Sequence, residues 1–338
     1  MKRPTISDVA AYAGVTKSTV SHALSGKRPV AAKTRARIDQ AIRSLGYQPH
    51  PVAQRLATGR SRTIGFVYPL YASEFSALEM KFIAGAAAVI NQANYVFALL
   101  TPPDRRADSL TRFLQSGLLD GVILMQVQLH DPRVAILRRA EIPFVLIGRC
   151  FDNAGLTFID LDIDLAISQC VEHLVALGHR HLAYLRLDDP DLGFAVRANQ
   201  AYVAACRRYD LPIVASACAL IPESGAQVAA TLLDAHPETT ALIVWNDLAA
   251  WGAMQAIQGH GLRIPADVSL ICFDLSTVAN IVPLRPTAVD IRPREMAAEA
   301  ARMLLAQLAA DATTPVQVLM EPRLIVGETT APPARRRA

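Results

Sequence analysis

Four polar residues stand close together near the start of the chain, on the outward face of a helix that the pattern predicts: Lys17, Ser18, Ser21 and His22. A lysine ammonium can donate to O6 and N7 of guanine, and a histidine ring nitrogen can do so too. The surrounding segment is strongly basic, because residues 1–62 hold twelve Lys and Arg and only two acids, a net charge of +10. This chemistry favours contact with a polyanion.

The rest of the chain has the opposite charge. It carries 22 basic and 28 acidic residues, a net charge of −6. A small basic module joined to a mildly acidic body indicates a polyanion partner for the first part only. Charge alone is also compatible with a solvated basic surface, so the arrangement of the helices has to decide between the two.

A second set of polar residues stands at the ends of predicted strands. Asn246 and Asp247 follow the apolar run ALIVW, Asp274 follows SLICF, and Arg197 lies where a loop enters a helix. An arginine and a carboxylate can each bind two neighbouring hydroxyls, and an amide can donate and accept at once. The alternatives are structural, with Asn246 and Asp247 as helix caps. For the other two residues, the structural alternatives are a role in a turn for Asp274 and an ion pair for Arg197.

Several classes of protein lack support in the sequence. It contains no HExxH, HxxEH, GxSxG or Walker loop, so no catalytic residue, metal or cofactor is expected. No apolar run of membrane-spanning length occurs, and the N-terminus does not resemble a signal peptide. The five scattered cysteines include no C-x-x-C pair and are predicted to be buried thiols. We therefore expect a protein that lies in the cytoplasm. We also expect that it is neither an enzyme nor a transport protein.

The segments around the first polar set predict three helices. Apolar residues recur at helical spacing over residues 5–13, 16–24 and 32–45, and Gly14 and Gly46 end the first and third of these helices. Two helices joined by a tight glycine turn and supported by a third are typical of a helix-turn-helix.

From residue 63 the pattern changes to short apolar runs separated by helical patterns. The runs do not alternate with polar residues, which is typical of parallel strands covered on both faces. The number of such units over about 270 residues predicts two α/β lobes, with ligands bound at the carboxyl ends of the strands. The predicted strands are TIGFVYPL, YVFALL, GVILMQ, FVLIGR, HLAYLRL, ALIVWN and VSLICFD, with a helix near 76–92.

Four segments together resemble the lactose-repressor (LacI/GalR) family of bacterial transcription regulators. They are TISDVAAYAGVTKSTVSHALSGK, YQPHPVAQRLATGRSRTIG, ALIVWNDLAAWGAMQAI and GLRIPADVSLICFD. The resemblance implies an α/β protein with an all-α helix-turn-helix domain and a two-lobed core like a periplasmic binding protein, with parallel sheets. The expected boundaries are 1–48 for the DNA-binding domain, 49–62 for a hinge helix and linker, 63–330 for the effector-binding and dimerisation core, and 331–338 for a disordered tail.

The resemblance assigns roles to the polar residues of the first domain. Lys17, Ser18 and His22 stand where the family reads bases, and many relatives have Arg in place of His22. Thr19 and Ser21 match phosphate contacts, which fix register without reading sequence. Solvated helix residues are the alternative interpretation. Thr5 is also placed among the DNA contacts.

The segment 51–58 resembles the family's hinge helix, in which Leu56 matches a leucine that enters the minor groove. An apolar wedge unstacks a base step and bends the duplex. Leu56 in a small apolar core is the alternative. Two paired hinge helices imply a homodimer on a pseudo-palindromic operator with a central CG step.

The resemblance also implies an effector, and it assigns Arg197, Asn246 and Asp274 to the binding of that effector. Phe75 and Trp245 are the aromatic residues best placed to stack on a sugar, although core packing is the alternative. A mono- or oligosaccharide is expected as the effector, with a nucleobase or nucleoside as the alternative. Relatives often have a small residue in place of Trp245 and an acid in place of Leu275. Inducer and corepressor both remain open.

Overall fold

The computed structural model describes residues 4–25, 28–47, 61–69, 75–115, 117–274, 284–309 and 314–334. The chain divides into two compact units. The first comprises residues 1–63 and 113–120, and the second comprises residues 64–112 and 121–338.

Three helices form the N-terminal part of the first unit, and all three agree with the predicted segments to within one residue. They are α1 (Ile6–Ala13), α2 (Lys17–Ser25) and α3 (Ala32–Leu45). Their inward faces meet in a small core of buried side chains that includes Val9, Val20 and Ile38. The helix-turn-helix arrangement is therefore confirmed.

The helices of the first unit end and begin where local chemistry requires. Thr5 precedes α1, and its backbone N–H and hydroxyl both donate to the Asp8 carboxylate at 2.7 Å. Gly14 ends α1 with φ 61°, a left-handed conformation that glycine adopts without a Cβ clash. The Thr16 hydroxyl then accepts from the backbone N–H of Thr19 at 3.2 Å and so caps α2.

The second unit is built on two six-stranded sheets. The sheet of the N-lobe has the order β11-β5-β4-β3-β1-β2, and the sheet of the C-lobe has the order β12-β10-β9-β8-β6-β7. The pairings whose direction is given are parallel, except the antiparallel pairing of β10 with β12. The strands are β1 (Thr63–Val67), β2 (Val96–Leu100), β3 (Gly121–Leu124), β4 (Phe144–Ile147), β5 (Phe158–Leu161), β6 (Leu182–Leu187), β7 (Ala215–Cys218), β8 (Ala241–Val244), β9 (Ser269–Phe273), β10 (Thr287–Asp290), β11 (Gln317–Met320) and β12 (Arg323–Ile325).

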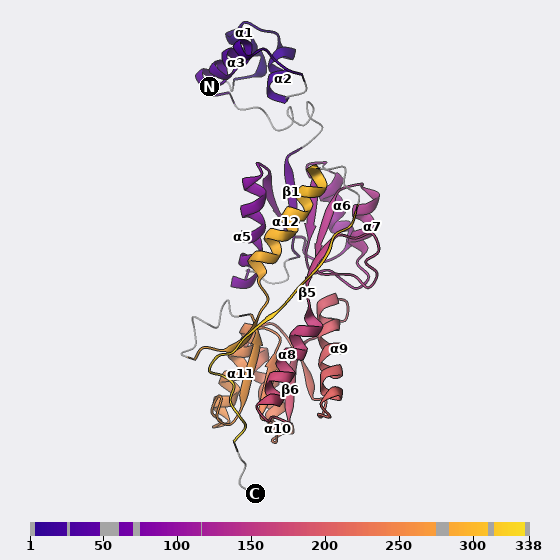
Figure 1. The fold of residues 1–338 in the computed structure, drawn as a ribbon, viewed down its shortest axis with the longest axis vertical. Coiled ribbons are helices and arrows are strands. Elements are labelled where there is room, and N and C mark those ends of the chain that lie inside the picture. The colour runs from indigo at the N-terminus through magenta and orange to yellow at the C-terminus, as the bar shows by residue number, and fades with distance from the viewer. Residues whose placement is uncertain are drawn as a thin grey trace. The chain divides into compact units, whose positions relative to one another are not determined.

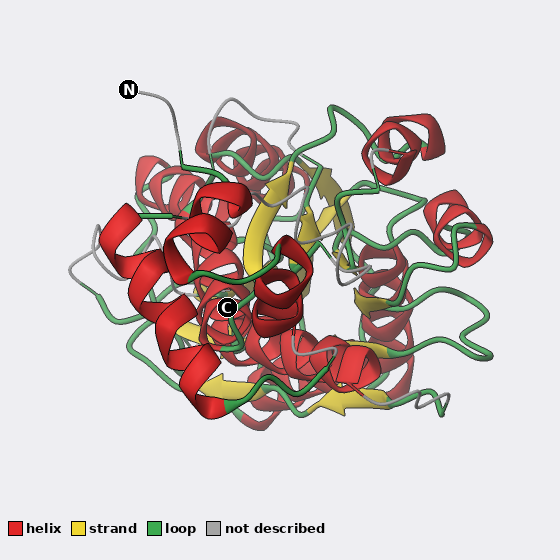
Figure 2. Cartoon of the chain, turned by 90° about the horizontal axis from the view of Figure 1, so that it is seen from above, coloured by secondary structure: helices red, strands yellow, loops and turns green. Residues whose placement is uncertain are grey.

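Helices flank the strands of this core (Figure 2), which explains why the inner strands are apolar on both faces. The remaining helices are α5 (Ala77–Gln92), α6 (Ala107–Gln115), α7 (Pro132–Arg139), α8 (Ile163–Ala176), α9 (Gly193–Arg208), α10 (Pro222–Ala235), α11 (Asp247–Gly259) and α12 (Pro293–Ala309).

The chain crosses between the lobes three times. It passes from β5 to α8, from β10 back to α12, and from β11 to β12. The helix α12 therefore lies beside α5 in the N-lobe, although most of the chain between them belongs to the C-lobe (Figure 1). Gly85 allows this approach, because a Cβ atom there would lie 2.3 Å from the backbone oxygen of Arg294.

The seven predicted strands are confirmed as β1, β2, β3, β4, β6, β8 and β9. Five strands were not predicted: β5, β7, β10, β11 and β12. Some of these lack a continuous apolar run, because β5 contains Asp160 and β10 ends in Asp290. The short strands β11 and β12 alternate between exposed and half-buried residues at the outer edges of the two sheets.

Further expectations concern the cysteines, membrane-spanning helices, metal sites and the end of the chain. All five cysteines are free and buried, as predicted. Over the described residues, no helix is long and apolar enough to cross a membrane, and no cluster of three metal-binding side chains occurs. The ordered chain continues beyond the predicted boundary at residue 330, because the backbone oxygen of Ala331 accepts from His179 at 2.9 Å and from Ser269 at 3.1 Å.

Candidate functional site

The predicted DNA contacts of α2 run along the helix, from Lys17 and Ser18 at its N-terminal end to His22 in its last turn. Lys17 and Ser18 are exposed, whereas Thr19, Ser21 and His22 are half-buried. The first turn of a helix favours anions, because its backbone N–H groups are not paired within the helix. This position suits both base and phosphate contacts, and the individual roles stay predictions. Leu56 lies outside the described residues.

Two arginines of α3 donate hydrogen bonds to backbone oxygens of the other two helices and of the turn between them. Arg37 donates to the backbone oxygen of Ala13 and to that of Gly14, the latter at 3.3 Å. Arg35 donates to the backbone oxygen of Ala23 near the end of α2. These side chains position the turn and α2, a role that counting charge along the sequence did not reveal.

A cavity of about 280 Å³ lies between the two lobes of the second unit, at the carboxyl ends of their strands. This is the location predicted for ligands in open parallel sheets. Residues after β1, β3, β4 and β5 of the N-lobe and after β6, β8, β9 and β10 of the C-lobe contribute to its lining. The polar residues of the lining are Glu79, Gln126, Asp160, Asp189, Asn246 and Asp274.

Three predicted effector residues, Trp245, Asn246 and Asp274, line the cavity. The Asn246 side chain also caps α11, because its Oδ1 accepts from the backbone N–H of Ala249 at 3.1 Å. Asp247 is the first residue of α11 rather than its cap, and its carboxylate accepts from the next backbone N–H at 2.8 Å. The structural alternative for Asn246 is thus realised, and its role as a ligand stays a prediction.

Asp274 is held in an uncommon conformation directly after β9. Its φ is 66°, its side chain is 6% exposed, and its Oδ1 lies 4.0 Å from Nζ of Lys81 on α5. Non-glycine residues with positive φ cost energy and are concentrated at functional sites. The conformation places an acidic group of the C-lobe opposite a lysine of the N-lobe.

The aromatic residues have packing partners. The Trp245 ring stacks on Phe194 with centroids 5.5 Å apart and on Phe273 with centroids 4.6 Å apart. Phe75 is not among the lining residues, and its ring meets the edge of Tyr68 at 5.8 Å. Phe75 therefore packs as the core alternative describes, and its stacking on a ligand stays a prediction.

Arg197 does not line this cavity but a second, more polar one, and it lies behind Asp160. Its Nη2 donates to the backbone oxygen of Arg149 at 2.8 Å and lies 3.5 Å from Oδ2 of Asp160. Burial raises the pKa of Asp160 to about 6, against the opposing effects of Arg197 and Arg149. Burial also lowers the pKa of Arg197. The ion-pair alternative is realised here, and direct contact with an effector stays a prediction.

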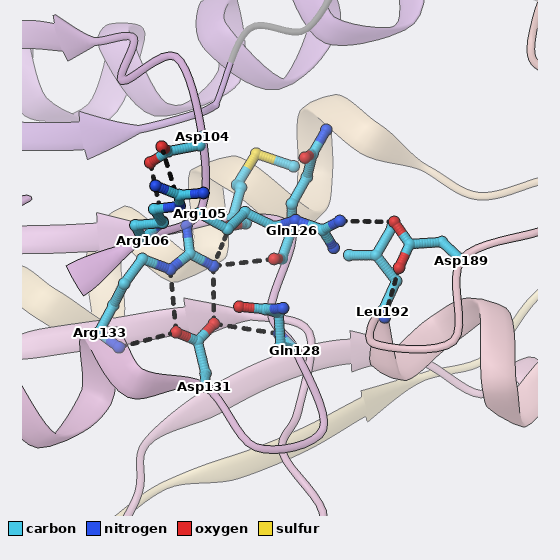
Figure 3. Close-up of polar contacts among 10 residues, drawn as sticks. Asp104, Arg105, Arg106, Gln126, Gln128, Asp131, Arg133, Asp189 and Leu192 are labelled. Atoms are coloured by element: carbon cyan, nitrogen blue, oxygen red, sulfur yellow. Dashed lines mark hydrogen bonds and ion pairs between the residues drawn. The ribbon is translucent and has the colours of Figure 1, made fainter. Parts of the chain in front are cut away.

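The loop after β3 contributes Gln126 to the cavity, a residue that was not predicted from the sequence. Gln126 has φ 52°, and its backbone oxygen accepts from Nη2 of Arg133 at 2.8 Å. Arg133 is completely buried and forms a double hydrogen bond with Asp131, with Nη2–Oδ2 2.6 Å and Nε–Oδ1 2.9 Å (Figure 3). An acid before a proline and an arginine after it were the only sequence signals of this loop.

Several contacts join the lobes beside the cavity. Nη2 of Arg105, after β2, lies 2.5 Å from Oδ2 of Asp189, after β6 (Figure 3). The backbone N–H of Gly193 in the C-lobe donates to the backbone oxygen of Val127 in the N-lobe at 3.0 Å. In the opposite direction, the backbone N–H of Leu129 in the N-lobe donates to a backbone oxygen of the C-lobe. These contacts therefore hold the two lobes together, and they are broken if the lobes move apart.

Two parts of the chain match models of known protein families. Residues 5–50 match the family described as "Bacterial regulatory proteins, lacI family", and residues 171–330 match "Periplasmic binding protein-like domain". The HTH-type transcriptional regulator CelR of Thermobifida fusca is 30% identical over 97% of this chain and 98% of its own length. The chain belongs to the lacI family. AglR of Rhizobium meliloti (strain 1021) is a further relative, with 32% identity over 97% of this chain and 94% of its own length.

Solved structures agree with this membership. The lac repressor dimer bound to operator and the anti-inducer ONPF has a TM-score of 0.85 at 25% identity, covering 98% of this chain and 100% of that one. The CelR–cellobiose complex has a TM-score of 0.74 at 27% identity, covering 97% and 100%. This lacI-family chain is a DNA-binding transcription regulator with a helix-turn-helix and a periplasmic-binding-protein-like core. The relatives named here are regulators, not enzymes.

Proposed function

We propose that the chain represses carbohydrate-utilisation genes and that a small carbohydrate, bound in the cavity between the lobes, controls its affinity for DNA. The observation that carries the proposal is the cavity itself, because both lobes line it and a bound molecule can favour one arrangement of the lobes over another. The cellobiose complex of CelR supports a carbohydrate as the effector.

The DNA partner in this proposal is a pseudo-palindromic operator with a central CG step, bound by a homodimer. The lac repressor dimer on its operator supports this arrangement. We further propose the division into residues 1–48 for the DNA-binding domain, 49–62 for the hinge and a core that begins at residue 63 and extends at least to Ala331. Lys17, Ser18 and His22 read bases in the major groove, and Leu56 enters the minor groove.

The sign of the control follows from which arrangement the effector prefers. An effector shifts DNA affinity only by its different affinity for the two states, with a coupling of about 1–3 kcal/mol. An inducer prefers the state with weaker DNA binding, and a corepressor prefers the other.

The test is capture of genomic fragments by the purified full-length protein, repeated with a panel of sugars and nucleobases. A palindrome released by one sugar establishes a sugar-induced repressor. A palindrome captured only after a small molecule is added establishes a corepressor. A response to a nucleobase alone contradicts the carbohydrate, and no enrichment in any condition contradicts the regulator itself.

The hinge can be tested separately with Leu56→Ala. We expect operator affinity to fall about tenfold, because the apolar wedge that stabilises the bent duplex is lost. Effector affinity, measured by calorimetry, should not change. An unaltered operator affinity contradicts the wedge.

A further inference from the structure

The cavity between the lobes carries acidic side chains but no basic one among its described lining residues. Its acids are Glu79, Asp160, Asp189 and Asp274, and the described lining includes no lysine, arginine or histidine. Most of the other lining residues are apolar or aromatic. A carboxylate in such surroundings attracts a cation more strongly than it does in bulk water, because the local dielectric constant is lower.

The charges of three of these carboxylates are balanced by basic groups outside the described lining. Asp160, Asp189 and Asp274 each have a carboxylate oxygen within 4.0 Å of an arginine or lysine nitrogen. Glu79 differs from them, because it forms no ion pair with any basic residue that the structure describes. The lining therefore presents one carboxylate charge, on α5 of the N-lobe, that no described cation balances.

Neutral donors hold the Glu79 carboxylate in place. Its Oε1 accepts from the Tyr68 hydroxyl at 3.0 Å, and its Oε2 accepts from the backbone N–H of Ser76 at 2.6 Å and from the Ser76 hydroxyl. A carboxylate has about four acceptor positions, so about one remains for a ligand. Glu79 is half-buried and lines the cavity, which leaves part of its surface open to a bound molecule. The group is thus oriented, and its charge is retained.

Aromatic rings from both lobes surround the same cavity. The face of an aromatic ring attracts an ammonium group, and the ring also buries apolar C–H surface. The indole of Trp245 stacks on two phenyl rings, which makes the C-lobe wall rigid. This combination of rings and a carboxylate suits a molecule that carries both an ammonium group and C–H surface. The aromatic lining residues are Tyr68, Phe82, Phe194, Trp245 and Phe273.

We infer that the effector is an amino sugar, whose protonated amine pairs with Glu79 and whose ring packs against the aromatic side chains of the cavity. The inference rests on the proposed carbohydrate effector and names the class of carbohydrate. An ammonium group donates charge-assisted hydrogen bonds to a carboxylate, which are roughly twice as strong as those between neutral groups. A neutral sugar offers only hydroxyls and leaves the charge of Glu79 unbalanced.

The test is calorimetric titration of the full-length protein, without DNA, at a pH below the pKa of the sugar amine. The probes are pairs that differ only by an ammonium group in place of a hydroxyl on each ring. We expect at least one amino sugar to bind at least about tenfold more tightly than its neutral partner. N-acetylglucosamine, which keeps the nitrogen without the charge, should lose this advantage. The pairs are glucosamine and glucose, galactosamine and galactose, mannosamine and mannose, and the β-1,4-linked dimer of glucosamine and cellobiose.

Glu79→Gln tests the carboxylate. A glutamine at this position of the capping box can still accept from the backbone N–H of Ser76, so α5 keeps its cap. The variant should bind the amino sugar about tenfold less tightly and the neutral partner within about twofold of the wild type. Glu223→Gln is the matched control, because Glu223 is exposed in the first turn of α10 and is not among the described lining residues. Thermal unfolding checks that both variants are folded.

A preference for the amino sugar that is lost in Glu79→Gln and kept in Glu223→Gln supports the inference. Neutral sugars that bind as tightly as their amino partners overturn it and leave the carbohydrate regulator intact. Absence of binding by every amino sugar up to about 1 mM, or equal losses for both members of a pair in Glu79→Gln, also overturns it. Failure of operator capture affects only the proposed function, since binding in the cavity is measured without DNA.

Discussion

Arg133 has no exposed surface, although arginine is among the residues least often buried. Its guanidinium binds the Asp131 carboxylate twice and the backbone oxygens of Met125 and Gln126. Nε and Nη2 of this buried charged group therefore find their partners within one loop, whereas Nη1 has none among the described residues. The consequence is a fixed backbone for Gln126, one of the residues that line the cavity.

We predict that Arg133→Met destabilises the protein by about 3–5 kcal/mol, because it leaves the Asp131 carboxylate buried without its partner. Urea unfolding of the full chain measures the change. Arg139→Met, an exposed position on the same helix, should change the free energy of unfolding by less than about 0.5 kcal/mol. Similar losses in both variants would refute a special role for the buried pair.

Asp160 predicts a dependence of stability on pH. Its pKa is raised to about 6 in the folded state from an ordinary value of 3.8, so the folded state holds the proton more tightly. The resulting stabilisation is complete below about pH 4 and is lost as pH rises through about 6. Relative to Asp160→Asn, the wild type should lose unfolding free energy over this interval, as measured by urea titration. A difference that is constant with pH contradicts the shift.

At the scale of elements, α3 determines where α2 stands. The turn between α1 and α2 exposes backbone oxygens at Ala13 and Gly14, and Arg37 binds both. Part of the positive charge of the helix-turn-helix therefore stabilises its own turn, and the rest is available to bind a polyanion.

Arg37→Gln is expected to destabilise the helix-turn-helix by about 1–2 kcal/mol and to weaken operator binding, because the turn loses its donor. Arg43→Gln removes the same charge from an exposed position of α3 and is the control. Operator affinity by fluorescence anisotropy and protease resistance of residues 4–47 measure the two effects. Equal changes in both variants would show that charge alone matters.

At the scale of the whole core, the two lobes meet through polar groups that are also close to the cavity. Gly193 begins α9 in the C-lobe, and a Cβ atom there would lie 2.7 Å from the backbone oxygen of Arg149 in the N-lobe. Glycine at this position thus permits the close approach of the lobes. A molecule bound between the lobes can favour an arrangement in which such contacts form.

Gly193→Ala is predicted to weaken effector binding about tenfold, because the added methyl group separates the lobes around the cavity. Operator affinity without effector should stay within about twofold. Gly259→Ala is the matched control, since a Cβ atom there meets nothing within 4 Å. Calorimetric titration with the effector that the panel identifies measures the change, and unaltered affinity in Gly193→Ala contradicts the role of this contact.

Local sequence patterns were sufficient for the family and for the helix-turn-helix and seven of the strands. Helical spacing with Gly14 and Gly46 located α1 and α3, and uninterrupted apolar runs located seven strands, because these signals depend only on nearby residues. The same patterns indicated that Asn246 and Asp274 follow strands. They could not reveal edge strands such as β11, whose pairing with β5 is formed across a long separation in the chain.

The composition of the cavity depended on tertiary structure. The chain crosses between lobes three times, so the cavity collects residues from α5 and from the carboxyl ends of nine strands. Spacing along the chain does not encode that proximity. The sequence by itself determined a helix-turn-helix, two α/β lobes and strand ends that carry polar groups. Only the packing of the lobes decided that Arg197 lies behind Asp160 and that Gln126 is among the residues that line the cavity, because side-chain direction and burial arise when distant elements meet.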